Sequence, residues 1–242
     1  MHDRWCGWRP LPAPPPSIPA GPWLDLSHPL SPELARIPFF PPARFARIMS
    51  MPADRLNVTE MQMVCHFGTH VDAPCHFIPD APAFHEIPLE RLHGPGVVWR
   101  VDATPYQEID AAILDRLRPA ATPGDIVLLD TGWAARLGTK EYERNPALTV
   151  DAAEWLVARG VKLVGVDFAT PDLAVDRRPA DFDWPVHHVL LAQGVLIAEH
   201  LTNLRPLAGR RVEAVFAAIN VVGADGGPVR AIARRIDAAA TE

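Results

Sequence analysis

The chain has 242 residues, 48% of them apolar, which is enough to bury the core of one large domain. Its formal net charge of −6 argues against a nucleic-acid-binding protein, which would carry a clustered basic face. No apolar run approaches the ~18 residues of a transmembrane helix, and the first residues lack the pattern of a signal peptide. The three cysteines do not suggest a disulfide framework. We therefore expect a soluble protein of the reducing cytoplasm.

Residues 1–22 contain seven of the 27 prolines and are predicted to form an extended arm, because proline lacks the N–H donor that helices and central strands need. Two alternatives stay open for this arm. It is either a flexible tail or a segment laid on a neighbouring subunit, where Trp5, Trp8 and Trp23 would be buried. No change in composition divides the remaining residues, 23–242, so they are expected to form a single domain.

Short strands of an antiparallel or mixed sheet are expected at residues 61–64 and 97–101. The apolar residues of segment 108–117 recur at helical spacing, which predicts a helix that Pro119 ends. Residues 126–129 form an unbroken apolar run between glycines, which is typical of a strand buried on both faces.

A second helix is predicted over residues 151–160, with Asp151 as its cap, Glu154 completing a capping box and Gly160 at its C-terminal end. Residues 161–168 then form another buried strand. Strand, helix and strand in this order indicate a parallel βαβ unit. Two further strands are expected at residues 194–199 and 212–219.

The segment CHFGTHVDAPCHF, residues 65–77, contains three of the ten histidines and one aspartate. Imidazole nitrogens and carboxylate oxygens are the ligands that Zn²⁺ and similar ions take. A helix of the HExxH type is excluded because Phe67 stands where that motif has glutamate, and because Gly68 and Pro74 oppose a helix. A strand fits better, and its alternating side chains place positions 66, 68, 70 and 72 on one face.

On a strand, His70 and Asp72 lie roughly 6.6 Å apart, close enough to share a metal ion. His66 and His70 would be roughly 13 Å apart if the chain were fully extended, which is too far for a single ion. A bulge or bend at Gly68 resolves this. We therefore expect either a bent strand around one ion or two ions bridged by Asp72. His76 follows a proline and can look back at the metal without binding it.

Two less specific interpretations of this segment are open. The histidines could be unrelated core or surface residues, which three histidines and an aspartate in register around a glycine make the weaker alternative. Cys65 and Cys75 could be thiolate ligands, but on a strand they point away from the metal face. We interpret both as small core residues.

A second candidate cluster lies in residues 187–201. Glu199 ends an apolar strand, where a carboxylate is costly unless it is paired or bound to a metal. His187 or His188 could complete a coordination sphere with it. The alternative is a structural ion pair between Glu199 and an arginine such as Arg230.

At these residues the sequence resembles the metal-dependent cyclase family, whose members include bacterial kynurenine formamidase and isatin hydrolase. The resemblance runs from DLSHPL (25–30) to PVRAIA (228–233), and HFGTHVDAPCHF matches the family signature. It implies that metal is bound by His66, His70 and Asp72, and that His76 donates and accepts protons. It also implies that His187 and Glu199, twelve residues apart, complete a two-zinc site, which leaves His188 the weaker candidate.

For the fold, the resemblance implies a single α/β domain with a mixed β-sheet or β-barrel-like core and flanking helices, of the swivelling β/β/α type. It also implies a homodimer or higher homo-oligomer. One departure concerns the substrate. The formamidase branch usually has an aromatic residue and a PGD-like turn after its first block, whereas this chain has IPFFPPARF (37–45). Phe39 or Phe40 would supply the aromatic wall, and with Trp23 would stack on an aromatic substrate.

The leading hypothesis is a metal-dependent hydrolase of an amide or lactam C–N bond, similar to an arylformamidase that acts on N-formylkynurenine or a related aromatic amide. Zn²⁺, as one or two ions, suits the ligands, and Mn²⁺ is tolerated. The alternatives are a lactam hydrolase of the isatin hydrolase type, a metal-dependent cyclase or lyase, and a metal-binding protein without catalysis. The partner is a small molecule, with no nucleic acid or membrane expected.

Overall fold

The computed structural model describes residues 4–12, 17–19 and 21–238, and its centre is a closed barrel of seven strands. Going round the barrel, the strands are β13 (Gly226–Ala238), β12 (Arg210–Ala218), β6 (His93–Arg100), β8 (Ile126–Asp130), β10 (Leu163–Val166), β11 (Leu196–Glu199) and β5 (His70–Asp72).

The barrel is mixed in strand direction. Strands β6, β8, β10 and β11 are parallel, whereas β12, β13 and β5 join them by antiparallel pairing. Strand β5 pairs with β11 on one side and with β13 on the other, and this double pairing closes the barrel. The predicted α/β class with a barrel-like mixed core is therefore confirmed.

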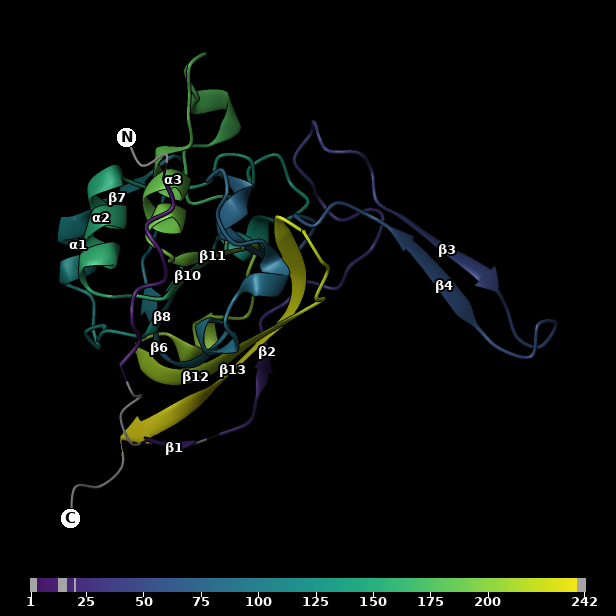
Figure 1. Ribbon diagram of the computed structural model, residues 1–242, viewed down its shortest axis with the longest axis horizontal. Coiled ribbons are helices and arrows are strands. Elements are labelled where there is room, and N and C mark those ends of the chain that lie inside the picture. The colour runs from purple at the N-terminus through teal and green to yellow at the C-terminus, as the bar shows by residue number, and fades with distance from the viewer. Residues whose placement is uncertain (1–3, 13–16, 20, 239–242) are drawn as a thin grey trace.

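Three α-helices cover one side of the barrel within the described residues, as Figure 1 shows. They are α1 (Ala111–Asp115), α2 (Val150–Ala158) and α3 (Pro185–Ala192). The remaining helical elements are 3₁₀ turns at Pro74–His76, Phe84–Glu86, Leu89–Arg91, Trp133–Arg136, Val175–Arg177 and Arg205–Leu207. Helix α3 was not predicted from the sequence, because almost every side of this helix is buried and its nearly unbroken apolar run shows no helical period.

Successive residues of the barrel strands pack in two different cores, as a strand's alternation requires. Val127 and Leu129 of β8 belong to the core that faces the helices, whereas Ile126 and Leu128 belong to the core inside the barrel. This is why the predicted strand at 126–129 has no polar face: both of its faces are buried.

The first predicted helix is shorter than expected. It begins only at Ala111, after Asp110, whose side chain accepts a hydrogen bond of 2.8 Å from the backbone N–H of Ile113. Residues Glu108–Ile109 instead form strand β7, which pairs with β9 (Ala147–Leu148). The helical spacing of the apolar residues does correspond to a helix, but residues 108–109, predicted as its start, pair with β9 as a strand.

The second predicted helix is confirmed, with a different cap. Thr149, and not Asp151, precedes the first turn, and its hydroxyl accepts a hydrogen bond of 3.4 Å from the N–H of Ala152. Gly160 lies just beyond the helix with a positive φ of 72°, a conformation that suits glycine at this end.

The predicted strand at 61–64 is confirmed only at residues 61–62, because β4 runs from Val58 to Gln62. It pairs with β3 (Arg44–Met49). This β3–β4 hairpin projects far from the barrel (Figure 1), and most of its side chains are exposed.

The described part of the N-terminal arm packs on its own chain and is not the flexible tail that was one alternative from the sequence. The other alternative, an arm that lies on a neighbouring subunit, stays a prediction. The N–H of Cys6 donates to the carbonyl of Ala192 at 3.0 Å, and the guanidinium of Arg91 lies 4.8 Å from the ring centre of Trp8. Trp5 and Trp8 are partly buried against the two cores, and these apolar contacts help to hold the arm there. Strands β1 (Ser17–Pro19) and β2 (Leu24–Asp25) then pair with β13.

The boundary at residue 22 between arm and domain stays a prediction, and part of the arm lies outside the described residues. Among the residues described, no helix is long and apolar enough to cross a membrane.

Candidate metal centre

Strand β5 holds the first part of the centre because it lies between two partner strands. Its pairing places His70 opposite Glu199 of β11 and Asp72 opposite Gly226 of β13. The strand is only three residues long, and just before it Gly68 adopts a positive φ of 67°. This bend, expected from the sequence, returns His66 to the side chains of β5, so the extended strand from 66 to 72 does not form.

The first cluster is formed by His66, His70 and Asp72, all of them buried. Oδ1 of Asp72 lies 2.8 Å from Nδ1 of His66 and 3.3 Å from Nε2 of His70. The structure therefore brings together the three residues proposed as ligands from their spacing.

A second cluster shares Asp72 and adds His187 and Glu199, which are also buried. Nε2 of His187 lies 3.3 Å from Oε1 of Glu199 and 3.5 Å from Oδ2 of Asp72. The other carboxylate oxygen of Glu199 lies 3.4 Å from Nε2 of His70. Asp72 thus directs one oxygen to each cluster, an arrangement that fits two cations bridged by this carboxylate.

The sequence left two alternatives for the second cluster: His188 in place of His187, and an ion pair between Glu199 and Arg230. The geometry supports neither. His188 belongs to neither cluster, and its Nε2 lies 3.6 Å from Oδ1 of the exposed Asp183. Arg230 forms an ion pair of 2.6 Å with Asp25 and does not reach Glu199.

Hydrogen bonds outside the clusters orient two of the imidazoles. Nδ1 of His187 donates to Oδ2 of Asp172 at 2.5 Å, and Nδ1 of His70 donates to the carbonyl of Gly68 at 2.8 Å. With the proton on Nδ1, each imidazole turns the lone pair of Nε2 towards the cluster. A carboxylate or carbonyl behind a histidine in this way is typical of metal sites.

The polar atoms of the clusters fit a cation. Nε2 of His70, Oδ2 of Asp72 and Oε1 of Glu199 are buried and have no hydrogen-bond partner among the described residues. Burying such atoms is costly unless something pairs with them. Imidazole and carboxylate are ligands that Zn²⁺ and Mn²⁺ accept, so the donor set fits one or two divalent ions.

Without a cation, the neighbouring carboxylates change the pKa of the histidines. Burial by itself lowers the pKa of His66, but Asp225 and Asp72 outweigh it and raise that pKa to about 10. Burial likewise raises the pKa of Asp72, but the surrounding imidazoles, led by His187, hold it well below its usual range. The centre is therefore dominated by negative charge that a cation would balance.

His76 lies beside the first cluster, on the 3₁₀ turn that Pro74 begins. Its ring stacks on that of His66 with the centres 3.9 Å apart, and its side chain is 23% exposed. His76 is thus the accessible imidazole next to the buried ones, as the sequence led us to expect.

Two further residues that contact the clusters were not predicted from the sequence. Asp172 accepts a hydrogen bond from His187, and Asp225 lies beside His66 and His76, with its Oδ2 3.1 Å from Nε2 of His66. Asp172 precedes His187 by 15 residues and Asp225 follows His76 by 149, so the spacing within a short motif gave no signal. Both nevertheless stand in segments that carry the family resemblance or adjoin it, VGVDFATPD and PVRAIA.

The aromatic residues expected to contact substrate are not all near the centre. Phe40 lies over His66 with ring centres 6.4 Å apart, and Phe39, which is 66% exposed, contacts Phe40 edge to face. Trp23 packs under the guanidinium of Arg234 on β13. Arg234 is eight residues beyond Gly226, which corresponds to roughly 26 Å along an extended strand. Within one chain Trp23 does not reach the centre.

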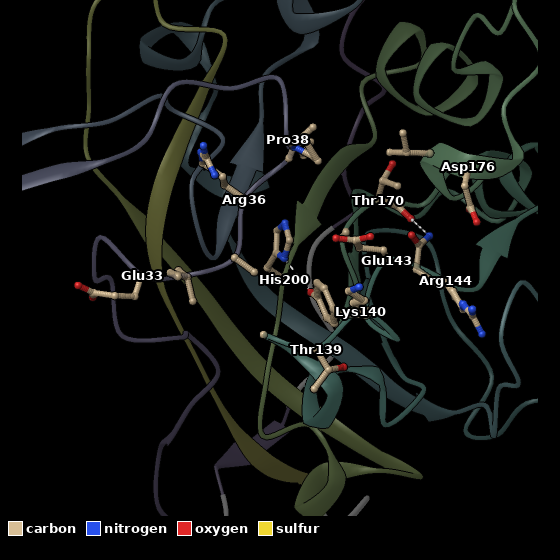
Figure 2. A pocket seen from close by; sticks show the side chains of 18 of the residues that line it. Glu33, Arg36, Pro38, Thr139, Lys140, Glu143, Arg144, Thr170, Asp176 and His200 are labelled. Atoms are coloured by element: carbon tan, nitrogen blue, oxygen red, sulfur yellow. Dashed lines mark hydrogen bonds between the residues drawn. The ribbon is translucent and has the colours of Figure 1, made fainter.

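A cavity of about 870 Å³ lies next to the centre, between segments 32–38 and 138–145 (Figure 2). It reaches His200, which follows Glu199 and whose ring centre lies 5.9 Å from that of His70. Nδ1 of His200 accepts the hydroxyl hydrogen of Tyr142 at 2.7 Å, and burial lowers the pKa of His200 to about 3. The candidate metal ligands do not line this cavity. His200 does, and it lies between the cavity and His70.

The amino-acid sequence matches the family model described as putative cyclase over residues 24–173. The chain belongs to this family. The match covers the first cluster and Asp172, while His187, Glu199 and Asp225 lie beyond it.

Individual relatives are similar to this chain over most of its length, including the part beyond residue 173. Kynurenine formamidase from Bacillus cereus is 29% identical over 216 residues, covering 88% of this chain and 98% of the relative. Isatin hydrolase A from Ralstonia solanacearum superposes with a TM-score of 0.79 at 25% identity, over 88% of this chain and 91% of the other. A structure described as a potential metal-dependent hydrolase with cyclase activity gives a TM-score of 0.71 at 25% identity, covering 88% and 96%.

Proposed function

We propose that this protein is a metal-dependent hydrolase of an amide or lactam C–N bond, similar to an arylformamidase that acts on N-formylkynurenine or a related aromatic amide. The observation that carries the proposal is the pair of His/carboxylate clusters sharing Asp72, next to the accessible imidazole of His76. The likeness to kynurenine formamidase over nearly the whole of that relative supports the same reaction.

In this proposal the metal ligands are His66, His70 and Asp72 for one ion and Asp72, His187 and Glu199 for a second. Zn²⁺ is the ion we expect, because it accepts this set of imidazole and carboxylate ligands, and Mn²⁺ is the alternative. A bound divalent ion supplies Lewis-acid polarisation of the carbonyl and lowers the pKa of water.

The chain's own contribution to catalysis is proton transfer by His76. Its imidazole takes a proton from the water that attacks the carbonyl carbon, and gives it to the nitrogen as the C–N bond breaks. The stacking of His76 on His66 keeps the two rings within reach of the same substrate atoms. The aromatic part of the substrate packs against Phe40, with Phe39 at the rim.

The second candidate is hydrolysis of a lactam, supported by the structural likeness to isatin hydrolase A. A cyclase or lyase using the same metal is a third, and a metal-binding protein without catalysis is disfavoured because His76 would then be surplus. An assay of the Zn²⁺- and Mn²⁺-loaded protein against N-formylkynurenine and isatin side by side tests these alternatives. We expect N-formylkynurenine to be cleaved, with one ¹⁸O atom entering the formate in ¹⁸O-water. Turnover of isatin alone would favour the lactam hydrolase over the arylformamidase. Turnover of neither substrate would contradict both hydrolase hypotheses.

We further propose that the protein is a homodimer in which the β3–β4 hairpin contacts a second copy of the chain. A two-stranded hairpin is at best marginally stable in water by itself, yet this one carries exposed Ile48, Met51 and Met61 far from the barrel. Light scattering should give twice the mass of the chain, and Ile48→Glu with Met61→Glu should reduce it to that of one chain. The three cysteines are unpaired in the structure, which suits the cytoplasm, where we expect the protein to act.

A further inference from the structure

The carboxylate of Asp225 lies against two stacked imidazoles. Its Oδ2 is 3.1 Å from Nε2 of His66 and 3.5 Å from Nδ1 of His76. The two rings are inclined by only 23°, so one nitrogen of each ring meets the same oxygen. One ring belongs to a proposed metal ligand and the other to the proposed acid/base, which makes Asp225 the group that connects them.

The backbone fixes the position of this carboxylate although the side chain is half exposed. The carbonyl of Asp225 accepts the N–H of Ala73 at 2.9 Å, and the carbonyl of Ala224 accepts the N–H of Phe84 at 2.8 Å. Asp225 is therefore held between β13 and the turn that follows β5, which is the turn that carries His76.

The next residue, Gly226, brings the ring of His66 to Asp225. A Cβ atom at Gly226 would lie 2.7 Å from Cε1 of His66, closer than such atoms approach, and 3.2 Å from its Nδ1, which is a tight contact. The imidazole thus rests directly on the backbone of the strand that Asp225 precedes. Only glycine leaves room for this contact.

We propose that Asp225 is a positioning residue, which accepts the Nδ1–H of His76 and so leaves Nε2 of His76 as the atom that takes and gives the proton. The proposal rests on the proposed function of His76 as the acid/base. A carboxylate at one nitrogen fixes the tautomer and orientation of a catalytic imidazole. The 3.5 Å separation is at the long end for a hydrogen bond, as is common for catalytic contacts before substrate binds. The same carboxylate supports His66 from behind.

The rival role for Asp225 is that of a metal ligand, since His66, His76 and Asp225 are close enough to share an ion. The test uses Asp225→Asn, which preserves the shape of the side chain, and Asp225→Ser as a second variant. Asp183→Asn is the matched control, because it removes a carboxylate 3.6 Å from His188, away from both clusters. Metal content is measured for each variant loaded with Zn²⁺.

The decisive readout is the tautomer of His76, taken from ¹H–¹⁵N correlation spectra of the ring nitrogens in the Zn²⁺-loaded protein. We expect the Nδ1–H form in the wild type and in Asp183→Asn, and a shift towards Nε2–H in both Asp225 variants. Both Zn²⁺ equivalents should still be bound at saturating Zn²⁺, although the ion held by His66 binds more weakly without the carboxylate behind that imidazole. In the assay, kcat should fall about 10- to 100-fold in the Asp225 variants while KM changes less than 3-fold.

An unchanged tautomer in both variants would overturn the positioning role, and loss of a metal equivalent would overturn it in favour of ligation. The spectra do not depend on turnover. If neither substrate is cleaved by the wild type, the proposed function fails, while the role of Asp225 towards His76 is still decided.

Discussion

Nδ1 of His187 donates a hydrogen bond of 2.5 Å to Oδ2 of Asp172, and both side chains are buried. Asp172 also accepts the backbone N–H groups of Val186 and His187 at 3.0 and 3.1 Å. The carboxylate therefore anchors the first turn of α3 and, through it, the imidazole that faces Asp72 and Glu199.

Replacing this carboxylate should weaken one metal site selectively. In Asp172→Asn, we expect affinity for one of two Zn²⁺ equivalents to fall about 10- to 100-fold, because the imidazole loses the charge that raises its basicity. Competition with a chelator measures the affinity. Asp176→Asn, which alters an exposed carboxylate bonded to Tyr106, is the control. Equal weakening of both equivalents would contradict the separate role of Asp172.

The shared carboxylate predicts a pattern of metal content. His187→Ala should reduce the bound metal from two equivalents to one, because His187 serves only the second cluster. Asp72→Ala should remove both, and His188→Ala should remove neither. Elemental analysis of the purified variants measures this, and an Asp72→Ala protein that keeps two ions would refute the bridging role.

His76→Ala should separate catalysis from metal binding. We expect metal content to be unchanged and kcat to fall about 10²- to 10⁴-fold, the usual contribution of a general acid/base. A variant that hydrolyses substrate at the wild-type rate would exclude His76 from proton transfer.

Asp167 should give the stability of the protein a dependence on pH between about 4 and 6. Burial raises its pKa to about 6, although Thr131 partly opposes this by hydrogen bonding. The folded state therefore holds a proton that the unfolded state has released, and the stabilisation present below pH ~4 is lost as pH rises through 6. The loss is about 3 kcal/mol at most, from ~2 pKa units at ~1.4 kcal/mol each.

Urea unfolding of the wild type and of Asp167→Asn at several pH values measures this difference. The free energy of unfolding of the wild type relative to the variant should fall over this range and then level off above pH 6. A constant difference would show that Asp167 has an ordinary pKa.

Gly226→Ala should disturb the first cluster through His66. The added methyl would lie 2.7 Å from Cε1 of His66 and 3.1 Å from the carbonyl oxygen of Val71, so the imidazole must move. We expect weaker binding of one Zn²⁺ equivalent, measured by titration calorimetry. A variant with wild-type affinity for both ions would mean that the ring of His66 does not rest there in solution.

Much of the candidate site could be anticipated because it is local in the chain. His66, His70 and Asp72 lie within seven residues, and the bend at Gly68 follows from a glycine between them. His76 follows after a proline turn. Alternation along a strand and the properties of glycine and proline are short-range effects, so spacing was informative there.

The misses have physical causes that lie elsewhere in the fold. The helix at 108–117 lost its first turn to pairing with β9, and α3 was hidden because burial on nearly all sides removes an amphipathic period. A free arm was one expectation, but Trp5 and Trp8 find apolar contacts on the same chain, which lie far from them in the sequence.

Residue type and spacing were enough to identify the candidate ligands His66, His70 and Asp72, the bend at Gly68 and the separate candidate His76. These follow from the chemistry of the side chains and from dihedral preferences over a few residues. The pairing of β5 with both β11 and β13 became visible only in the folded chain, and this closure sets Glu199, His187 and Asp225 around Asp72. Contacts between residues more than a hundred positions apart depend on how the barrel closes, which no local pattern records.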